Sequence, residues 1–218
     1  MKSTFFSLFV LAFLFVSCGQ TTGEEATTED AVAIEEVASA ETYNIDASQS
    51  NLEWEGTKLV GEGHVGTINV QGGSLEVEGG NIMGGKLMID MASLTSTDLD
   101  GEGLQKLNGH LMSPDFFNVE KYPTATFEIA SATPVDGQEG VTHEIKGNLT
   151  MKDQTKAITF PAGVQMMDGK IMATSPAFTI DRTDWGIVYG AEGSVADLAK
   201  DKTINKEIGL KLNLVAMK

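Results

Sequence analysis

Several residue types are scarce in this sequence, and each scarcity excludes a class of protein. The chain has 218 residues and a single cysteine, Cys18, which excludes an internal disulfide and any cysteine-based metal cluster. It has 15 Lys plus Arg against 31 Asp plus Glu, for a formal net charge of −16. Because nucleic-acid binding needs a basic surface, nucleic acid is excluded as a partner. Only one basic residue, Arg182, is an arginine.

Residues suited to catalysis or metal binding are also few. The histidines are His64, His110 and His143, and no two of them stand at metal-ligand spacing. The chain has no GxSxG motif, and its one cysteine lies at the N-terminal end. Acid pairs such as Asp181 and Asp184 arise by chance in a chain with 31 acids. The sequence therefore predicts a protein without enzymatic activity and without a bound metal, and leaves a carboxylate-pair hydrolase as the minor alternative.

The N-terminal residues 1–18 have the pattern of an export signal. Lys2 precedes an apolar run from Phe5 to Val16, which is too short for a membrane-spanning helix. The segment 14–18, LFVSC, resembles a bacterial lipobox, in which Cys18 becomes the lipidated first residue of the mature chain. We therefore expect a lipoprotein in the cell envelope of a Gram-negative bacterium, periplasmic or at the outer-membrane surface. An ordinary signal peptide with an incidental cysteine is the alternative.

Residues 19–42 have a composition typical of a linker. They contain seven acidic residues, no basic residue and no aromatic residue. Such a segment buries too little apolar surface to fold, so we expect a disordered tether with a reach of about 27 Å.

Residues 43–218 have the periodicity of an all-β domain. Apolar and polar residues alternate in short segments, among them 65–70, 124–131 and 206–216, and turn residues separate these segments. We expect a closed antiparallel up-and-down barrel of about eight strands. A two-sheet sandwich is the alternative. Closure is favoured because the long segment 206–216 could pair with the first strand and remove both exposed edges.

One stretch interrupts the strands. Leu104, Leu107 and Leu111 share one face of a predicted short helix, and Phe116 and Phe117 follow it directly. An apolar segment of this kind beside a barrel predicts a lid.

Two segments resemble a known family. Residues 110–129, HLMSPDFFNVEKYPTATFEI, and residues 178–186, FTIDRTDWG, are similar to the central and late motifs of the YceI-like family. The resemblance extends over residues 43–216 and implies a lipocalin-like barrel that holds long polyisoprenoid chains. The sequence departs from the family pattern at 47–50, at Lys58 and at 107–108, so the resemblance leaves the ligand's head group open.

We therefore predict a non-catalytic carrier of an isoprenoid or similar amphiphilic lipid. Arg182 and Lys58 are the head-group candidates, and the alternative for Arg182 is a structural ion pair with Asp115, Asp181 or Asp184. The strong negative charge favours a neutral head group such as a quinone over a pyrophosphate. The runner-up is a filled barrel that binds a protein or polysaccharide, and a homodimer is left open. The predicted ligand-facing residues are Trp54, Phe116, Phe117, Phe127, Ile129, Phe160, Phe178 and Trp185.

Overall fold

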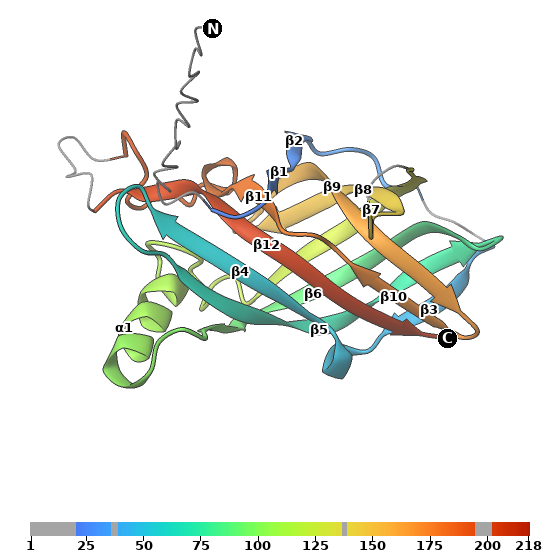
Figure 1. Cartoon of the computed structure of the whole chain (residues 1–218), viewed down its shortest axis with the longest axis horizontal. Helices are drawn as coiled ribbons and strands as arrows, with labels where there is room; N and C mark the ends of the chain where they lie inside the picture. Colours follow the sequence, from blue (N-terminus) through green and yellow to red (C-terminus); the bar gives the residue numbers. More distant parts are fainter. Residues whose placement is uncertain (1–20, 36–38, 137–138, 195–201) are drawn as a thin grey trace, which may run out of the picture.

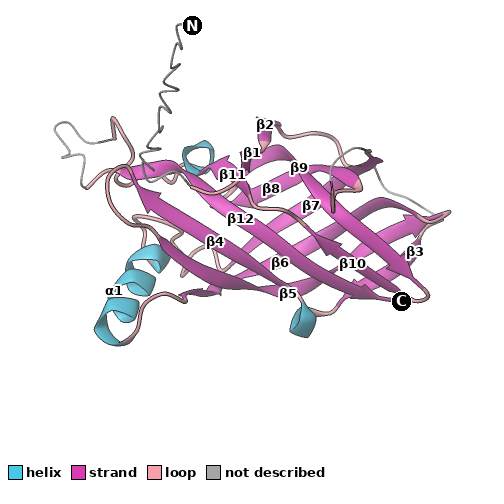
Figure 2. Ribbon diagram, viewed as in Figure 1, coloured by secondary structure: helices cyan, strands magenta, loops and turns pink. Residues whose placement is uncertain are grey.

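A computed structural model describes residues 21–35, 39–136, 139–194 and 202–218, and these residues form an elongated β-barrel (Figure 1). The main strands are long and antiparallel, and one helix lies at one end of the barrel (Figure 2). The elements of the barrel wall are β3 (Glu41–Ile45), β4 (Asn51–Lys58), β5 (His64–Glu78), β6 (Asn81–Ser96), β7 (Thr124–Pro134), β8 (His143–Met151), β9 (Gln154–Met167), β10 (Lys170–Thr174), β11 (Phe178–Asp181) and β12 (Ile204–Met217).

The last strand closes the barrel. One edge of β12 pairs with β10 and β11, and its other edge pairs with β3 and β4. The short helical turn η1 (Ala47–Gln49) joins β3 to β4, and both pair with β5, so they act as one bent strand. Together with β10–β11 as a second bent strand, the ring has eight members. The predicted closed barrel is confirmed, and the sandwich alternative is wrong.

Strand β5 is longer than the sequence pattern suggested. Residues 71–74, QGGS, resemble a hairpin turn, yet the strand continues through them. Gly72 and Gly73 have φ values of 148° and 137°, and the pairing with β6 shifts register here. A Cβ at Gly73 would come within 1.9 Å of the Lys86 carbonyl oxygen, so glycine permits the neighbouring strands to approach.

The first described segment corrects the predicted tether. Residues of β1 (Glu24–Glu25) pair in parallel with β11, and β2 (Thr27–Asp30) pairs antiparallel with β9. The Ala26 N–H donates to the Thr179 carbonyl at 2.8 Å, and Ala26 is buried. The segment thus fills the seam between β11 and β9, and over residues 21–35 the expectation of disorder is wrong.

Polar contacts along the wall explain why so acidic a segment docks. The buried Asn148 amide accepts a hydrogen bond from Val32 N at 2.9 Å and donates one to Val32 O at 2.8 Å. Lys146 pairs with Glu29 at 2.7 Å and Lys156 with Asp30 at 3.0 Å. Backbone pairing and these complementary charges replace the apolar burial that composition alone would require.

Helix α1 (Gly101–Met112) confirms the predicted helix beside the barrel end. None of its residues is fully buried, because it covers an opening rather than a core. No helix among the described residues is long and apolar enough to cross a membrane. The sequence also favours a short helix at 194–199, almost all of which lies outside the described residues.

Candidate ligand-binding cavity

The barrel lumen contains a cavity of about 280 Å³ at the end where α1 lies. We call it the outer cavity. Its walls are the inward-facing side chains of the strands, and its cover is formed by α1 and the segment after it. The apolar lining residues are Leu52, Trp54, Ile68, Ile89, Met91, Leu94, Leu107, Leu111, Phe116, Phe117, Ala125, Leu149, Met151, Ile180, Ile204, Ile208 and Leu210.

Polar side chains that line the outer cavity gather toward its mouth. They are Thr57, Lys58, Glu62, His64, His110 and Arg182. The lumen therefore runs from a polar mouth to an apolar interior, which is the arrangement that suits an amphiphilic ligand.

Polar contacts hold the lid to the barrel, both just before α1 and on α1 itself. Before α1, the Asp98 carboxylate accepts hydrogen bonds from Ser96 Oγ at 2.7 Å and Val65 N at 3.2 Å, and it lies 2.9 Å from His64 Nδ1. Partial burial raises the pKa of Asp98, but these hydrogen bonds outweigh it and lower the pKa to about 2. On α1 itself, the Asn108 amide accepts from Ser96 N at 3.0 Å and donates to Thr95 Oγ1 at 2.9 Å.

After α1, an aromatic cluster covers the mouth. The His110 ring meets the Phe116 ring edge-on at 5.0 Å and the Tyr189 ring at 4.7 Å. His110 Nε2 lies 3.3 Å from Asp115 Oδ2, so the imidazole pairs with a carboxylate. Phe116 is buried, whereas Tyr189 is 44% exposed.

Arg182 lies at the wall of the outer cavity and is almost fully buried. Its guanidinium donates to the carbonyl oxygens of Ile187 at 2.5 Å, Asn205 at 3.1 Å and Ile204 at 3.3 Å. Burial lowers the pKa of Arg182, and the nearby Asp181 and Glu207 carboxylates raise it. Arg182 has no carboxylate partner within ion-pair distance among the described residues, so the predicted structural ion pair is wrong. Its charge is stabilised by backbone dipoles.

Trp54 carries an unsatisfied donor. Its Nε1 is the one buried side-chain nitrogen or oxygen in the described part of the chain without a hydrogen-bond partner. The indole packs over the paired strand, where a Cβ at Gly66 would come within 2.5 Å of the ring. Buried indole N–H groups usually have a hydrogen-bond partner, so this donor is an exception among the described residues.

Three phenylalanine rings pack against one another deeper in the barrel than the outer cavity, whose lining contains none of them. The Phe127 and Phe160 rings are 5.6 Å apart, and the Phe160 and Phe178 rings stack at 4.4 Å with an interplanar angle of 8°. Beyond them lies a second cavity of only about 40 Å³, the deep cavity. Its lining includes Phe127 and Phe160 together with Ile129.

The sequence of the barrel domain matches the model of the YceI-like domain over residues 43–216. The chain belongs to the YceI-like family. A UPF0312 protein of Pseudomonas putida is 28% identical over 171 residues, which cover 74% of this chain and 84% of that protein. A UPF0312 protein of Pseudomonas aeruginosa is 37% identical over 100 residues, which cover 46% of this chain and 44% of that protein.

Solved structures share the fold of this YceI-like barrel. Burkholderia cenocepacia BcnA has a TM-score of 0.57 at 19% identity, covering 79% of this chain and 99% of its own. A polyisoprenoid binding domain from Saccharophagus degradans, implicated in plant cell wall breakdown, has a TM-score of 0.56 at 20% identity. That comparison covers 80% of this chain and 97% of the Saccharophagus chain. At these identities the likeness concerns the fold alone.

The YceI-like barrel brings only part of the predicted ligand-facing set together. Trp54, Lys58, Phe116, Phe117 and Arg182 all line the outer cavity. Phe127, Ile129 and Phe160 line the deep cavity instead.

The other two predicted residues belong to the packed core. Phe178 is buried in the phenylalanine stack. Trp185, in the short helical turn η2 (Arg182–Trp185), is fully buried and donates its indole N–H to the Leu149 carbonyl at 2.9 Å. Neither side chain belongs to the lining of the outer or the deep cavity.

Several lining residues were missed by the sequence reasoning. Met91, Ile204 and Ile208 line the outer cavity, and so do His64 and His110 at its mouth. The alternation within β6 would have pointed to Met91. Nothing in the sequence indicated which histidines line the cavity. The described residues contain no group of three or more His, Cys, Asp or Glu side chains that could hold a metal ion.

Proposed function

We propose that this protein is a non-catalytic carrier that binds an isoprenoid or similar amphiphilic lipid in the outer cavity. The observation that carries the proposal is the apolar cavity of about 280 Å³ with polar side chains at its mouth. The fold it shares with the polyisoprenoid binding domain of Saccharophagus degradans supports the same ligand class. Burial of about 400 Å² of an isoprenoid would contribute on the order of 10 kcal/mol before the costs of binding.

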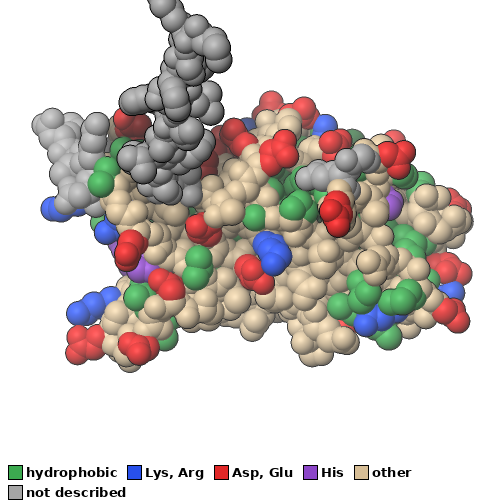
Figure 3. Space-filling model, in the orientation of Figure 1, with side chains coloured by type: hydrophobic (Ala, Val, Ile, Leu, Met, Phe, Trp, Pro, Cys, Tyr) green, Lys and Arg blue, Asp and Glu red, His purple; other side chains and the backbone are tan. Residues whose placement is uncertain are grey.

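The groups around the cavity favour a neutral head group. Three nitrogens of Arg182 already donate to backbone carbonyls, whereas the Trp54 indole N–H lacks an acceptor. Acidic side chains are spread widely over the face drawn in Figure 3, in keeping with the formal net charge of −16. A quinone or alcohol head group would not bring a further negative charge to an acidic protein. Tighter binding of undecaprenyl phosphate than of a matched quinone at low salt would contradict this preference.

The runner-up, a filled barrel that serves only as an interaction module, fits the inner half of the lumen alone. The deep cavity in that half has a volume of only about 40 Å³, whereas the outer cavity has about 280 Å³. A purely structural barrel would lose dispersion contacts around the larger space without compensation.

The proposed site of action is the cell envelope, with a lipid on Cys18 as the anchor. Thr21 Oγ1 lies 3.0 Å from Thr57 Oγ1, and Thr57 lines the outer cavity. Because three residue steps span at most about 10 Å, an anchor on Cys18 would hold the cavity mouth near the bilayer surface. A Cys18→Ser variant should then move from the membrane fraction to the soluble fraction. The same distribution for both proteins would contradict the anchor.

Quinone quenching of tryptophan fluorescence tests the carrier function. A short-chain ubiquinone bound in the outer cavity would lie beside Trp54, so saturable quenching is expected. Farnesol, which does not quench, should restore the fluorescence by competition. Quenching that rises linearly with quinone and is insensitive to farnesol would contradict binding in the cavity.

A further inference from the structure

The lumen of this barrel is divided in two by the rings of Phe127, Phe160 and Phe178, which we call the phenylalanine partition. The division can be followed strand by strand. On β7, Ala125 lines the outer cavity and Ile129 the deep cavity, with Phe127 between them. On β12, Leu210 lines the outer cavity and Leu212 the deep cavity.

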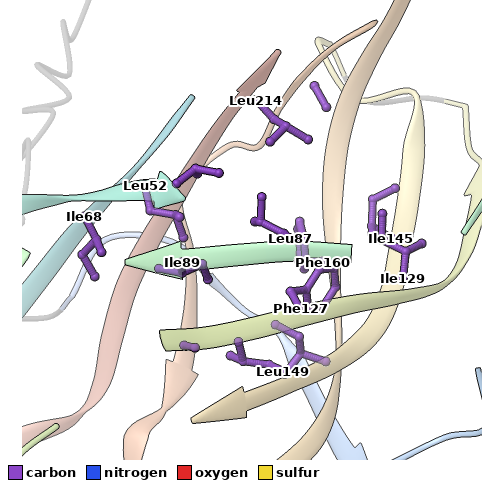
Figure 4. Packing of buried hydrophobic residues seen from close by; sticks show 14 of the residues in the cluster. Leu52, Ile68, Leu87, Ile89, Phe127, Ile129, Ile145, Leu149, Phe160 and Leu214 are labelled. Carbon is purple, nitrogen blue, oxygen red and sulfur yellow. The ribbon is translucent and has the colours of Figure 1, made fainter. Parts of the chain in front are cut away.

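The neighbouring strand β6 meets the partition at Leu87. Leu87 on β6 is the strand partner of Phe127, and its neighbour Ile89 already belongs to the outer cavity. In Figure 4, Leu87, Phe127 and Phe160 converge between a group that includes Ile89 and a group that includes Ile129. All three partition rings are at most 7% exposed.

The partition is fixed in place by backbone. A Cβ at Gly147 on β8 would lie 2.6 Å from Phe127 Cζ and 2.4 Å from the Glu128 carbonyl oxygen. The Phe127 ring therefore rests against bare backbone, where no other residue type fits. Phe160 is held between two rings, at 5.6 Å from Phe127 and 4.4 Å from Phe178. Rings packed in this way on both sides do not swing aside at small cost.

We propose that the phenylalanine partition limits how far a prenyl tail enters the barrel, and so sets the chain length that contributes to binding. This inference rests on the proposed lipid-carrier function. From Ile204 to Leu210, β12 lines the outer cavity for six residue steps, which is about 20 Å of strand. With a strand tilt of about 40°, this corresponds to about 15 Å along the barrel axis.

A prenyl tail can be compared with that depth. Each isoprene unit adds four chain bonds of about 1.5 Å in zigzag, or about 5 Å. The outer cavity therefore takes about three units, and further units of a longer tail remain outside it. The ligand class is a farnesyl-like tail on a neutral head group.

The test compares the wild-type protein with Phe127→Ala for geraniol, farnesol, geranylgeraniol and solanesol, by competition against the quinone probe. Because these alcohols differ in solubility, the readout is the ratio of variant to wild-type affinity for each alcohol. We expect a ratio near one for geraniol and farnesol. For geranylgeraniol and solanesol we expect a ratio of about ten or more, because removal of the ring lets a further unit become buried.

A matched control separates depth from loosened packing. Ile82→Ala enlarges the deep cavity on its far side and leaves the partition intact, so its ratio should be the same for all four alcohols. Where Phe127→Ala does not fold, Phe127→Leu should give a smaller change in the same direction.

The outcomes distinguish the two proposals. Ratios for Phe127→Ala that do not depend on chain length would overturn the partition and leave the carrier function standing. Binding of none of the alcohols by the wild-type protein would overturn the carrier function and the partition together.

Discussion

Whether residues 21–35 dock on the barrel wall or form a free tether can be tested by one substitution. Asn148→Ala removes the two hydrogen bonds, at 2.9 and 2.8 Å, that fix Val32 to β8. At about 1 kcal/mol each, their loss should make opening of the segment easier by about 2 kcal/mol. Amide hydrogens in 24–30 should then exchange about 30-fold faster than in the wild-type protein.

Hydrogen–deuterium exchange followed by mass spectrometry measures this change on the peptide that contains Ala26. Asn69→Ala is the control, since Asn69 is an exposed asparagine on β5, three strands away from β8 in the ring. It should leave exchange at 24–30 unchanged. Fast exchange at 24–30 in the wild-type protein, with no further effect of Asn148→Ala, would refute docking and restore the tether.

Three further predictions concern the lumen and its lid. Phe116→Ala should weaken quinone binding about tenfold or more through lost apolar contact, and unchanged affinity in the quenching titration would place the ligand elsewhere. Gly147→Ala should lower the free energy of unfolding by about 1–3 kcal/mol, because the added Cβ would collide with the Phe127 ring and the Glu128 carbonyl oxygen. Urea unfolding measures this change, and an unchanged midpoint would show that the Phe127 ring can move aside. Asp98, with its pKa lowered to about 2, stabilises the fold above about pH 4, and this contribution is lost as the pH falls toward 2. Asp98→Asn should therefore lose less stability than the wild-type protein between pH 4 and pH 2, and equal losses would contradict the assigned hydrogen bonds.

The barrel itself could be predicted from the sequence because its physical cause is local. Alternating residues on each strand and the long final strand determined the closed ring, and the leucine spacing determined α1. The glycine pair at 72–73 could not be interpreted from sequence alone, because the same residues serve a turn or a bulge and only the facing strand decides between them. Composition failed for 21–35 because the docking partners, such as Asn148, lie more than a hundred residues away.

The site was predicted less completely, for a reason that also lies in long-range geometry. Residue type identified Trp54, Phe116 and Arg182 as lumen residues, and all three line the outer cavity. It did not distinguish them from Phe127 and Phe160, which also face inward but line the deep cavity. Whether an inward phenylalanine lines a cavity or divides it depends on which rings face it from other strands.

Native mass spectrometry of the protein purified from its own cell envelope, followed by lipid extraction, tests the carrier function most directly. The account predicts a stoichiometric adduct whose fragments include an isoprenoid series and a neutral head group. A ligand-free mass that persists after incubation with quinones and prenols would contradict it, and would favour the filled barrel that binds a protein or polysaccharide.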